Sequence, residues 1–282
     1  MNKFGAHKLL NPKIGLIMMA VYMAFLNLSV MRSTPEILIF FFIIFVLLFR
    51  KAETNNFIKD WAPYLGLFLL YEFLRGIVDD ISPLYEQTLY IIHHLEIGIF
   101  GMLPTKILQN YFFENNFVMS LSLFFYGTFF FYSFVVAFFL WLKVDRNVFH
   151  IYFKGFLLLT YISLLFYFLF PTAPPWFVDN VLGLNLKRIV YSETILSSFG
   201  HISTYRYFVG GNPVAAFPSL HVAWPAFTSL FLIGKFGKRH IWTLIFPLMI
   251  GFSIVLTAEH YVLDVIAGLL FGYAFTKYHP RE

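Results

Sequence analysis

The sequence contains no cysteine, and only 12% of its 282 residues are charged. The absence of cysteine excludes disulfide bonds and thiolate metal sites, so neither can stabilise this chain. Soluble domains usually carry about 25% charged residues. The sequence also contains no repeat, low-complexity tract or separate soluble domain. An ordinary soluble protein is therefore excluded.

Hydrophobic residues are abundant instead. They make up 59% of the chain and include 39 Phe, and the mean hydropathy is +0.73. A helix needs about 20 apolar residues to cross a bilayer. The first apolar segment follows Lys3, Lys8 and Lys13, as a signal peptide would, but the further segments favour a retained span. The second is short and contains Pro35 and Glu36. We predict an all-α, polytopic transmembrane helix bundle of about eight spans: 14–31, 33–49, 61–78, 117–142, 150–170, 217–234, 241–258 and 260–277.

The stretch 79–116, between the third and fourth spans, is too polar to cross a membrane as a whole. Its segment Thr88–Gln109 contains Gly98, Gly101 and Pro104, residue types that weaken or interrupt helices. We predict an interfacial or re-entrant element there.

The orientation of the bundle follows from its positive charges, because cytoplasmic loops carry an excess of Lys and Arg. A cytoplasmic N-terminus puts most of them inside, in the set Lys3, Lys8, Lys13, Arg50, Lys51, Lys59, Lys143, Arg146, Lys235, Lys238, Arg239, Lys277 and Arg281. The outer loops then receive Arg32, Lys106, Lys187, Arg188 and Arg206. We predict an integral membrane protein with both termini in the cytoplasm. The Phe-, Ile- and Lys-rich composition favours a prokaryotic cell membrane.

Two polar residues stand at the start of the last span, where they are costly and need a reason. His260 and Asp264 are four residues apart, so they share one helix face. A carboxylate at this spacing can bind one ring nitrogen and leave the other as a lone pair, which makes the imidazole nucleophilic or basic. A structural hydrogen bond between helices would use the same pair.

A second polar motif, Pro218-Ser219-Leu220-His221, stands at the start of the sixth span. Proline suits a first helical turn, and the free N–H groups of a helix start bind anions. Ser219 can add a hydroxyl. A plain loop-to-helix junction is the alternative, but both motifs fall on the extracytoplasmic face together with the 171–216 loop. We therefore predict a single extracytoplasmic site containing His221, His260 and Asp264.

Metal binding is a competing use of two histidines and one aspartate. The outer region offers no His-x-x-x-His or Glu-x-x-His pair to complete a ligand set. His93, His94 and His201 are the further candidate ligands, at spacings that are not typical of a metal site. We expect neither a metal ion nor a cofactor.

These residues resemble a known family. Phe217-Pro218-Ser219-Leu220-His221, followed by His260 and Asp264, is similar to the type 2 phosphatidic acid phosphatase superfamily. Two further stretches, Phe170–Trp176 and Leu95–Thr105, resemble its branch with the inositol phosphorylceramide synthase catalytic subunit and prokaryotic relatives. The resemblance covers roughly 60–277. It implies a six-helix phosphatase-like core, and we divide the chain into an N-terminal transmembrane hairpin, 1–60, and a catalytic transmembrane domain, 61–282.

The resemblance also implies a mechanism. His260 is the nucleophile that forms a phosphohistidine, and Asp264 orients it. His221 protonates the departing oxygen and then activates the acceptor. Ser219 and nearby backbone N–H groups bind the phosphate oxygens. Apart from the resemblance, we assign Pro174, Pro175 and Trp176 to the wall of a substrate loop; a place in the aromatic belt at the membrane interface is the alternative for Trp176.

The sequence departs from the family pattern at three points. Leu220 replaces the glycine that usually precedes the first histidine, and Ile254 follows Ser253 where an arginine is usual. The family's first element, a lysine followed by Arg-Pro, is not recognisable. Leu220 and the missing arginine favour the synthase-like branch.

These departures leave the phosphate without a cation. Arg206 is nearest in sequence to the Pro218–His221 motif, and we favour it for phosphate binding. Lys187 and Arg188 lie in the same loop, and we count them as substrate-loop residues; a part in catalysis and contact with lipid headgroups fit them equally well. Arg75 is a further cation, but an ion pair with Glu72 or Asp79 accounts for it equally well.

A phosphohistidine is the shared intermediate of two reactions, which differ in the acceptor of the phosphoryl group. An alcohol acceptor makes the protein a phosphotransferase that moves a group such as phosphoinositol, whereas water makes it a lipid-phosphate or polyprenyl-pyrophosphate phosphatase. We favour transfer. The expected partners are a lipid phosphate, membrane lipids and a hydroxyl acceptor or water, and no nucleic acid. A lipid transporter is a more remote alternative, since no inverted repeat is visible, and a purely structural role is a third.

Overall fold

The computed structural model describes residues 51–77, 81–188 and 212–277, with side chains from residue 56 onward. The predicted spans 14–31 and 33–49, and also Asp79, His201 and Arg206, lie outside these residues. The chain divides into two compact units, Met1–Thr54 and Asn55–Glu282.

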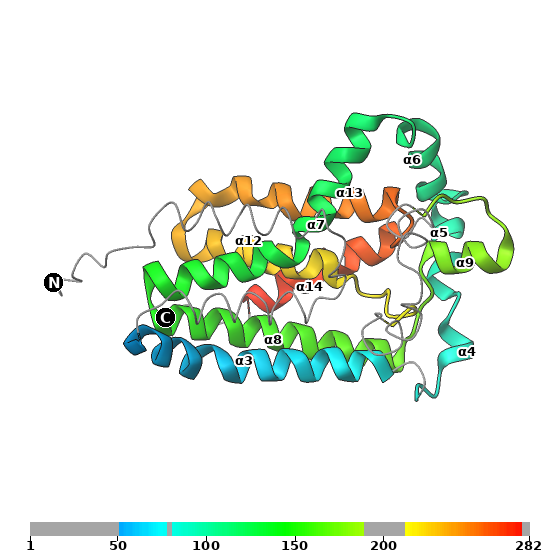
Figure 1. The fold of residues 1–282 in the computed structure, drawn as a ribbon. Coiled ribbons are helices and arrows are strands. Elements are labelled where there is room, and N and C mark those ends of the chain that lie inside the picture. The colour runs from blue at the N-terminus through cyan, green and yellow to red at the C-terminus, as the bar shows by residue number, and fades with distance from the viewer. Residues whose placement is uncertain (1–50, 78–80, 189–211, 278–282) are drawn as a thin grey trace, which may run out of the picture. The chain divides into compact units, whose positions relative to one another are not determined.

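The described residues are helical, and their elements are shown in Figure 1. The first half contains α3 (Lys51–Ile77), α4 (Tyr85–Thr88), α5 (Ile91–Phe100), α6 (Pro104–Phe112), α7 (Asn116–Phe139) and the π-helical turn η1 (Leu140–Val144). The second half contains α8 (Arg146–Leu169), α9 (Pro175–Leu182), α12 (Leu220–Phe236), the 3₁₀ helix η3 (Lys238–Leu244), α13 (Ile245–Leu256) and α14 (Val262–Lys277). Within these residues there is no strand, and one isolated parallel bridge pairs Thr172 with Ala215.

Three of these helices are long and apolar enough to cross a membrane: Asn116–Val144, Arg146–Leu169 and Lys238–Leu256. They correspond to the predicted spans 117–142, 150–170 and 241–258. Helix α12 is apolar but shorter, and the predicted spans 61–78 and 260–277 coincide with α3 and α14. The described residues therefore give an all-helical membrane protein.

The segment before α7 is bent, as predicted. The stretch Tyr85–Phe100 and α6 together are apolar enough for one span but meet at 71°, the geometry of a broken span or a re-entrant loop. Gly101 ends α5 in the left-handed conformation with φ of 75°, and Pro104 begins α6. Gly98, which we also expected to interrupt this segment, lies inside α5.

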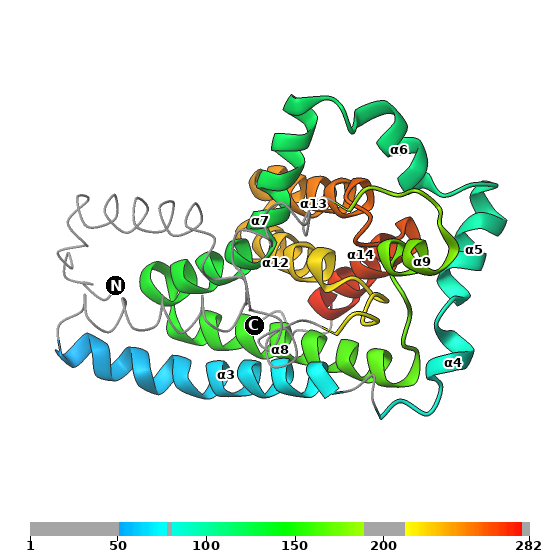
Figure 2. The same ribbon diagram turned by 45° about the vertical axis from the view of Figure 1, so that its right-hand side comes forward.

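Contacts at both ends of the helices show that α3, α7 and α8 alternate in direction. At one end, the buried Asp60 of α3 accepts hydrogen bonds from Trp141 and Arg146, where α7 passes through η1 into α8. At the other end, Ser82 donates to the carbonyl of Phe168 near the end of α8. Figures 1 and 2 show α3 and α8 side by side along their lengths.

Helix α12 forms the centre of this unit, because it packs against α7, α8, α13 and α14. Its closest partner is α14, which approaches it through Gly268 and Gly272. A Cβ atom on Gly268 would lie 2.5 Å from the carbonyl oxygen of Ser219, and one on Gly272 would lie 2.7 Å from the backbone nitrogen of Phe227. Small residues four apart let two membrane helices approach closely, and here they hold the middle of α14 against the first half of α12.

The close approach leads to a stability prediction. Gly268→Ala puts a methyl group against the α12 backbone, so we expect it to lower the free energy of unfolding by about 1–3 kcal/mol, the usual cost of overpacking. Gly234→Ala, at a helical glycine of α12 with open space around it, is the matched control. Thermal unfolding of both variants in detergent measures the difference. Equal unfolding temperatures would contradict the packing described here.

Candidate active site

Three predicted residues, His221, His260 and Asp264, lie in contact. The Nδ1 atom of His221 is 3.0 Å from Nε2 of His260, and Nδ1 of His260 is 3.2 Å from Oδ2 of Asp264. His260 and Asp264 are buried. When Nδ1–H of His260 donates to Asp264, Nε2 carries the lone pair, and that lone pair points toward His221. The carboxylate thus fixes which ring nitrogen of His260 is available for attack.

The turn before α14 places this histidine. After α13 ends at Leu256, Ala258 adopts the left-handed conformation with φ of 64°. The backbone N–H groups of Glu259 and His260 then both donate to the carbonyl of Ile254, at 2.9 and 3.1 Å. His260 therefore lies in a closed turn rather than at the first position of the helix.

Asp264 binds the backbone as well as the histidine. Its Oδ2 accepts the N–H of Tyr261 at 2.9 Å, which is the return contact of a helix capping box. Its own carbonyl accepts the N–H of Ser219 at 3.2 Å. One residue thus fixes the histidine ring, the start of α14 and the start of α12.

Ser219 is the N-cap residue of α12, but its side chain does not cap the helix. The hydroxyl is buried and, within the described residues, has no hydrogen-bond partner. An N-cap serine normally accepts a backbone N–H of its own helix. The serine hydroxyl thus lies without a partner among the described residues at a helix start, a position that favours an anion.

We predicted that Pro218 lies in the first turn of α12, and this prediction was wrong. Helix α12 begins at Leu220, and Pro218 precedes the N-cap with a cis bond to Phe217. Its carbonyl accepts the hydroxyl of Tyr167 at 2.9 Å. This proline therefore shapes the approach to the helix and takes no part in its first turn.

His221 is partly exposed, and its ring packs against α7. Phe129 lies 4.3 Å from it between ring centroids, and Tyr126 stacks on it at 5.5 Å. These rings limit how the imidazole can turn. The Phe-rich run of α7 thus contributes one wall of the site.

The Phe170–Trp176 stretch joins three separate segments by backbone hydrogen bonds. Thr172 donates its N–H to Val214 and accepts the N–H of Phe217 on its hydroxyl, while Ala173 donates to Leu89. The backbone N–H of Trp176 donates to the backbone carbonyl of Ala258 at 3.1 Å. The stretch therefore connects the segment before α12, the end of α4 and the turn that carries His260. Pro174 and Pro175 lead into α9, with Pro175 at its first position.

Arg188 lies beside the turn that carries His260. Its guanidinium binds both carboxylate oxygens of Glu259, at 2.9 and 3.2 Å, and lies 3.5 Å from the centroid of the Trp176 ring. Lys187 lies over the Phe113 ring at 4.2 Å, and its backbone exchanges two hydrogen bonds with the side chain of Gln109. The structure thus places Arg188 and Trp176 at the site, and it places Lys187 against α6.

Arg75 forms an ion pair with Glu72 at 2.7 Å, which is the structural alternative that the sequence left open. The side chain of Asn212 donates to the backbone carbonyl of Arg75 at 3.1 Å. The segment before α12 is thereby tied to the end of α3. Arg206, the cation that the sequence favoured, lies outside the described residues.

In the part of the chain that the structure describes, no three His, Asp or Glu side chains gather in a way that could bind a metal ion. Of the further candidate ligands, His93 is buried with Nδ1 at 3.1 Å from the hydroxyl of Tyr261, and His94 is exposed.

Comparison with known proteins agrees with this geometry. The family model of the PAP2 superfamily matches residues 92–276, a range that contains His221, His260 and Asp264. The chain belongs to the PAP2 superfamily. The match begins after α3, so Arg75 lies outside it.

Similar proteins lie in one branch of this family. The phosphoinositol dihydroceramide synthase of Bacteroides thetaiotaomicron is 24% identical over 257 residues, which cover 83% of this chain and 81% of that protein. The inositol phosphorylceramide synthase catalytic subunit AUR1 of Saccharomyces cerevisiae is 24% identical over 284 residues, covering 92% of this chain and 66% of that protein. The corresponding subunit of Schizosaccharomyces pombe is 25% identical over 144 residues, covering 48% of this chain and 34% of that protein. No solved structure matches the chain.

Sequence reasoning missed three residues that support the site. Thr172 and Tyr167 bind the backbone on either side of Phe217–Pro218, and Glu96 binds the start of α14. Glu96 and Thr172 lie inside the stretches that resemble the synthase branch, which was a usable signal. Nothing in the sequence distinguished Tyr167 from the other tyrosines of its span.

Proposed function

We propose that this PAP2 protein transfers a phospho-headgroup from a lipid donor to a hydroxyl acceptor through a phosphohistidine on His260. The observation that carries the proposal is the chain of contacts from His221 through His260 to Asp264, next to a helix start whose serine hydroxyl has no hydrogen-bond partner among the described residues. It combines a nucleophile, an acid–base group and an anion site, the three parts that phosphoryl transfer needs.

In the first step, the Nε2 lone pair of His260 attacks the phosphorus of the donor lipid. The bond from phosphorus to the lipid oxygen breaks, and protonated His221 gives that oxygen its proton. Asp264 stabilises the positive charge that the His260 ring acquires, as the buried carboxylate of a catalytic triad does. The phosphorus must enter between the two rings, so the 3.0 Å contact of the free enzyme has to open.

In the second step, His221 is neutral and accepts the proton of the acceptor hydroxyl. The acceptor oxygen forms a bond to phosphorus while the bond to Nε2 of His260 breaks. His221 is then protonated again, and His260 is again free of phosphorus and neutral. The cycle requires no metal ion or cofactor, because the imidazole itself is the nucleophile.

The phosphate oxygens require positive charge or N–H donors throughout. We assign this role to Ser219, the first-turn N–H groups of α12 and a nearby arginine. Arg206 remains the candidate from sequence. Arg75 is an additional candidate, because Asn212, just before α12, binds its backbone carbonyl.

Trp176 and Arg188 supply the wall of the substrate loop beside His260. Their cation–π stack and the ion pair with Glu259 hold the loop against the catalytic turn. We place this wall on the extracytoplasmic side of a prokaryotic cell membrane, with both termini in the cytoplasm, as the charge distribution predicts.

Transfer and hydrolysis differ in the acceptor. The synthases of Bacteroides thetaiotaomicron and Saccharomyces cerevisiae carry phosphoinositol or inositol phosphoryl in their names, which favours transfer to an alcohol. Hydrolysis of a phosphatidate or polyprenyl pyrophosphate is the second candidate, because His221 can activate water as well as an alcohol.

The experiment gives purified protein a phosphatidylinositol labelled in its inositol ring, together with a ceramide-type hydroxyl acceptor. We expect label in the acceptor lipid. Label released as a water-soluble phosphate ester, with none in the acceptor, would establish hydrolysis and reject transfer. A transporter would instead move labelled lipid across vesicle membranes without breaking any bond to phosphorus.

A further inference from the structure

Glu96 is a buried carboxylate that contacts the catalytic helix from outside it. It lies on α5, and its side chain is fully buried. Its two oxygens accept the backbone N–H groups of Val262 and Leu263, each at 3.1 Å. These are the first two residues of α14, the helix that carries Asp264.

The start of α14 needs these acceptors. A helix begins with backbone N–H groups that have no partner inside the helix. The N-cap residue here is Tyr261, whose side chain cannot accept them as a serine or aspartate would. Asp264 takes the N–H of Tyr261, and Glu96 takes the next two. Two carboxylates thus share the helix start, where the partial positive charge of the helix favours negative groups.

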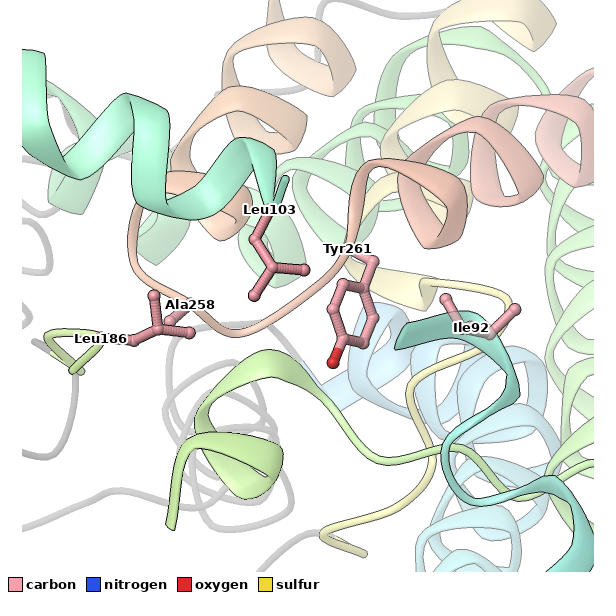
Figure 3. Close-up of a cluster of buried hydrophobic side chains, with 5 residues drawn as sticks. All are labelled: Ile92, Leu103, Leu186, Ala258 and Tyr261. Atoms are coloured by element: carbon pink, nitrogen blue, oxygen red, sulfur yellow. The ribbon is translucent and has the colours of Figure 1, made fainter. Parts of the chain in front are cut away.

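A second contact from α5 binds the same place. His93, three residues before Glu96 and on the same helix face, contacts the Tyr261 hydroxyl through Nδ1 at 3.1 Å. Figure 3 shows the Tyr261 ring in a cluster with Ile92 and Leu103. Helix α5 therefore binds three consecutive residues, 261 to 263, directly between His260 and Asp264.

We propose that Glu96 is a positioning residue for the catalytic pair. By fixing the first turn of α14, it sets the Oδ2 atom of Asp264 where it binds both Tyr261 and His260. The inference rests on the proposed function for its kinetic test. Glu96 does not act on the substrate directly, since it is fully buried and both oxygens bind backbone.

The test uses Glu96→Gln, which keeps the shape but presents an NH₂ group to one of the two N–H donors. We expect kcat per folded molecule to fall by about 10- to 100-fold, because small displacements of reacting groups have effects of this size, with KM within about twofold of wild type. Glu96→Asp keeps the charge and should recover part of the loss.

The control is Asp60→Asn. It neutralises another buried carboxylate, which lies near the start of α3 and binds Arg146. It should lower the unfolding temperature and leave kcat per folded molecule within about twofold. A folded Glu96→Gln enzyme with wild-type kcat would overturn the proposal, and so would an equal loss of kcat in Asp60→Asn. Should Glu96→Gln fail to fold, Glu96→Asp decides: a wild-type kcat rejects the positioning role, and a reduced kcat with unchanged KM supports it.

Vanadate binding separates this inference from the proposed function, since vanadate mimics a phosphoryl group in transit and needs no lipid. Titration calorimetry should show weaker vanadate binding in Glu96→Gln than in wild type and Asp60→Asn. If wild-type protein binds vanadate but forms no product from donor lipid and acceptor, the proposed reaction is rejected. The comparison of vanadate affinities still tests the positioning role in that case. Equal vanadate affinity in all three proteins would reject the positioning role.

Discussion

Replacing His260 by asparagine is expected to reduce turnover by about 10⁴-fold or more, to the level of background. Asparagine can still bind Asp264 but has no lone pair at the position of Nε2, so the covalent step is lost. Donor lipid should still bind, because the helix start with Ser219 and the loop wall with Trp176 are unchanged. The measurement is turnover and lipid binding of the same purified sample.

His240→Asn is the matched control. His240 lies in η3, and its Nδ1 is 3.4 Å from the carbonyl of Gly237. This variant should keep wild-type turnover. An His260→Asn enzyme that retains more than a few per cent of the wild-type rate would show that another group is the nucleophile.

Asp264→Asn should give the second large effect, a fall in kcat of about 10³- to 10⁴-fold. Asparagine cannot stabilise the charge that His260 acquires, and its NH₂ group opposes the ring N–H, which favours the wrong tautomer. It can still accept the N–H of Tyr261 through its oxygen, so the start of α14 should persist. Kinetics and thermal unfolding of the purified variant check both parts.

A small kinetic effect with a large loss of stability would assign Asp264 a structural role. That outcome corresponds to the alternative that the sequence left open, a polar pair that only joins helices. The buried position of Asp264 and its contacts with both helix starts make some loss of stability compatible with catalysis. The ratio of the two effects is therefore the informative quantity.

Residues close together in the sequence were predictable to a useful degree. The spacing of His260 and Asp264 predicted their contact, although His260 precedes α14 and does not lie on its face. The break at Gly101 and Pro104 was visible from residue types. Charge placement brought His221 to the same face. Local patterns of this kind depend on a few neighbouring residues, so a single sequence contains them.

Contacts between distant segments were not predictable in this way. The bond from Glu96 to Val262 and Leu263 depends on how α5 packs against α14, which no local pattern encodes. The same holds for Tyr167 and for the ion pair between Arg188 and Glu259. Pro218 was misplaced for a related reason: a proline before a helix fits either the first turn or the loop, and the contact from Tyr167 belongs to the loop arrangement.

The central claim is a covalent bond between phosphorus and Nε2 of His260. Mass spectrometry of enzyme quenched during turnover under mildly alkaline conditions, which preserve phosphohistidine, measures it directly. We predict a phosphorus-containing adduct on the peptide with His260, and no adduct on that peptide in the His260→Asn variant. An adduct on a different residue, or a fully active enzyme in which no adduct forms at any time point, would contradict this account.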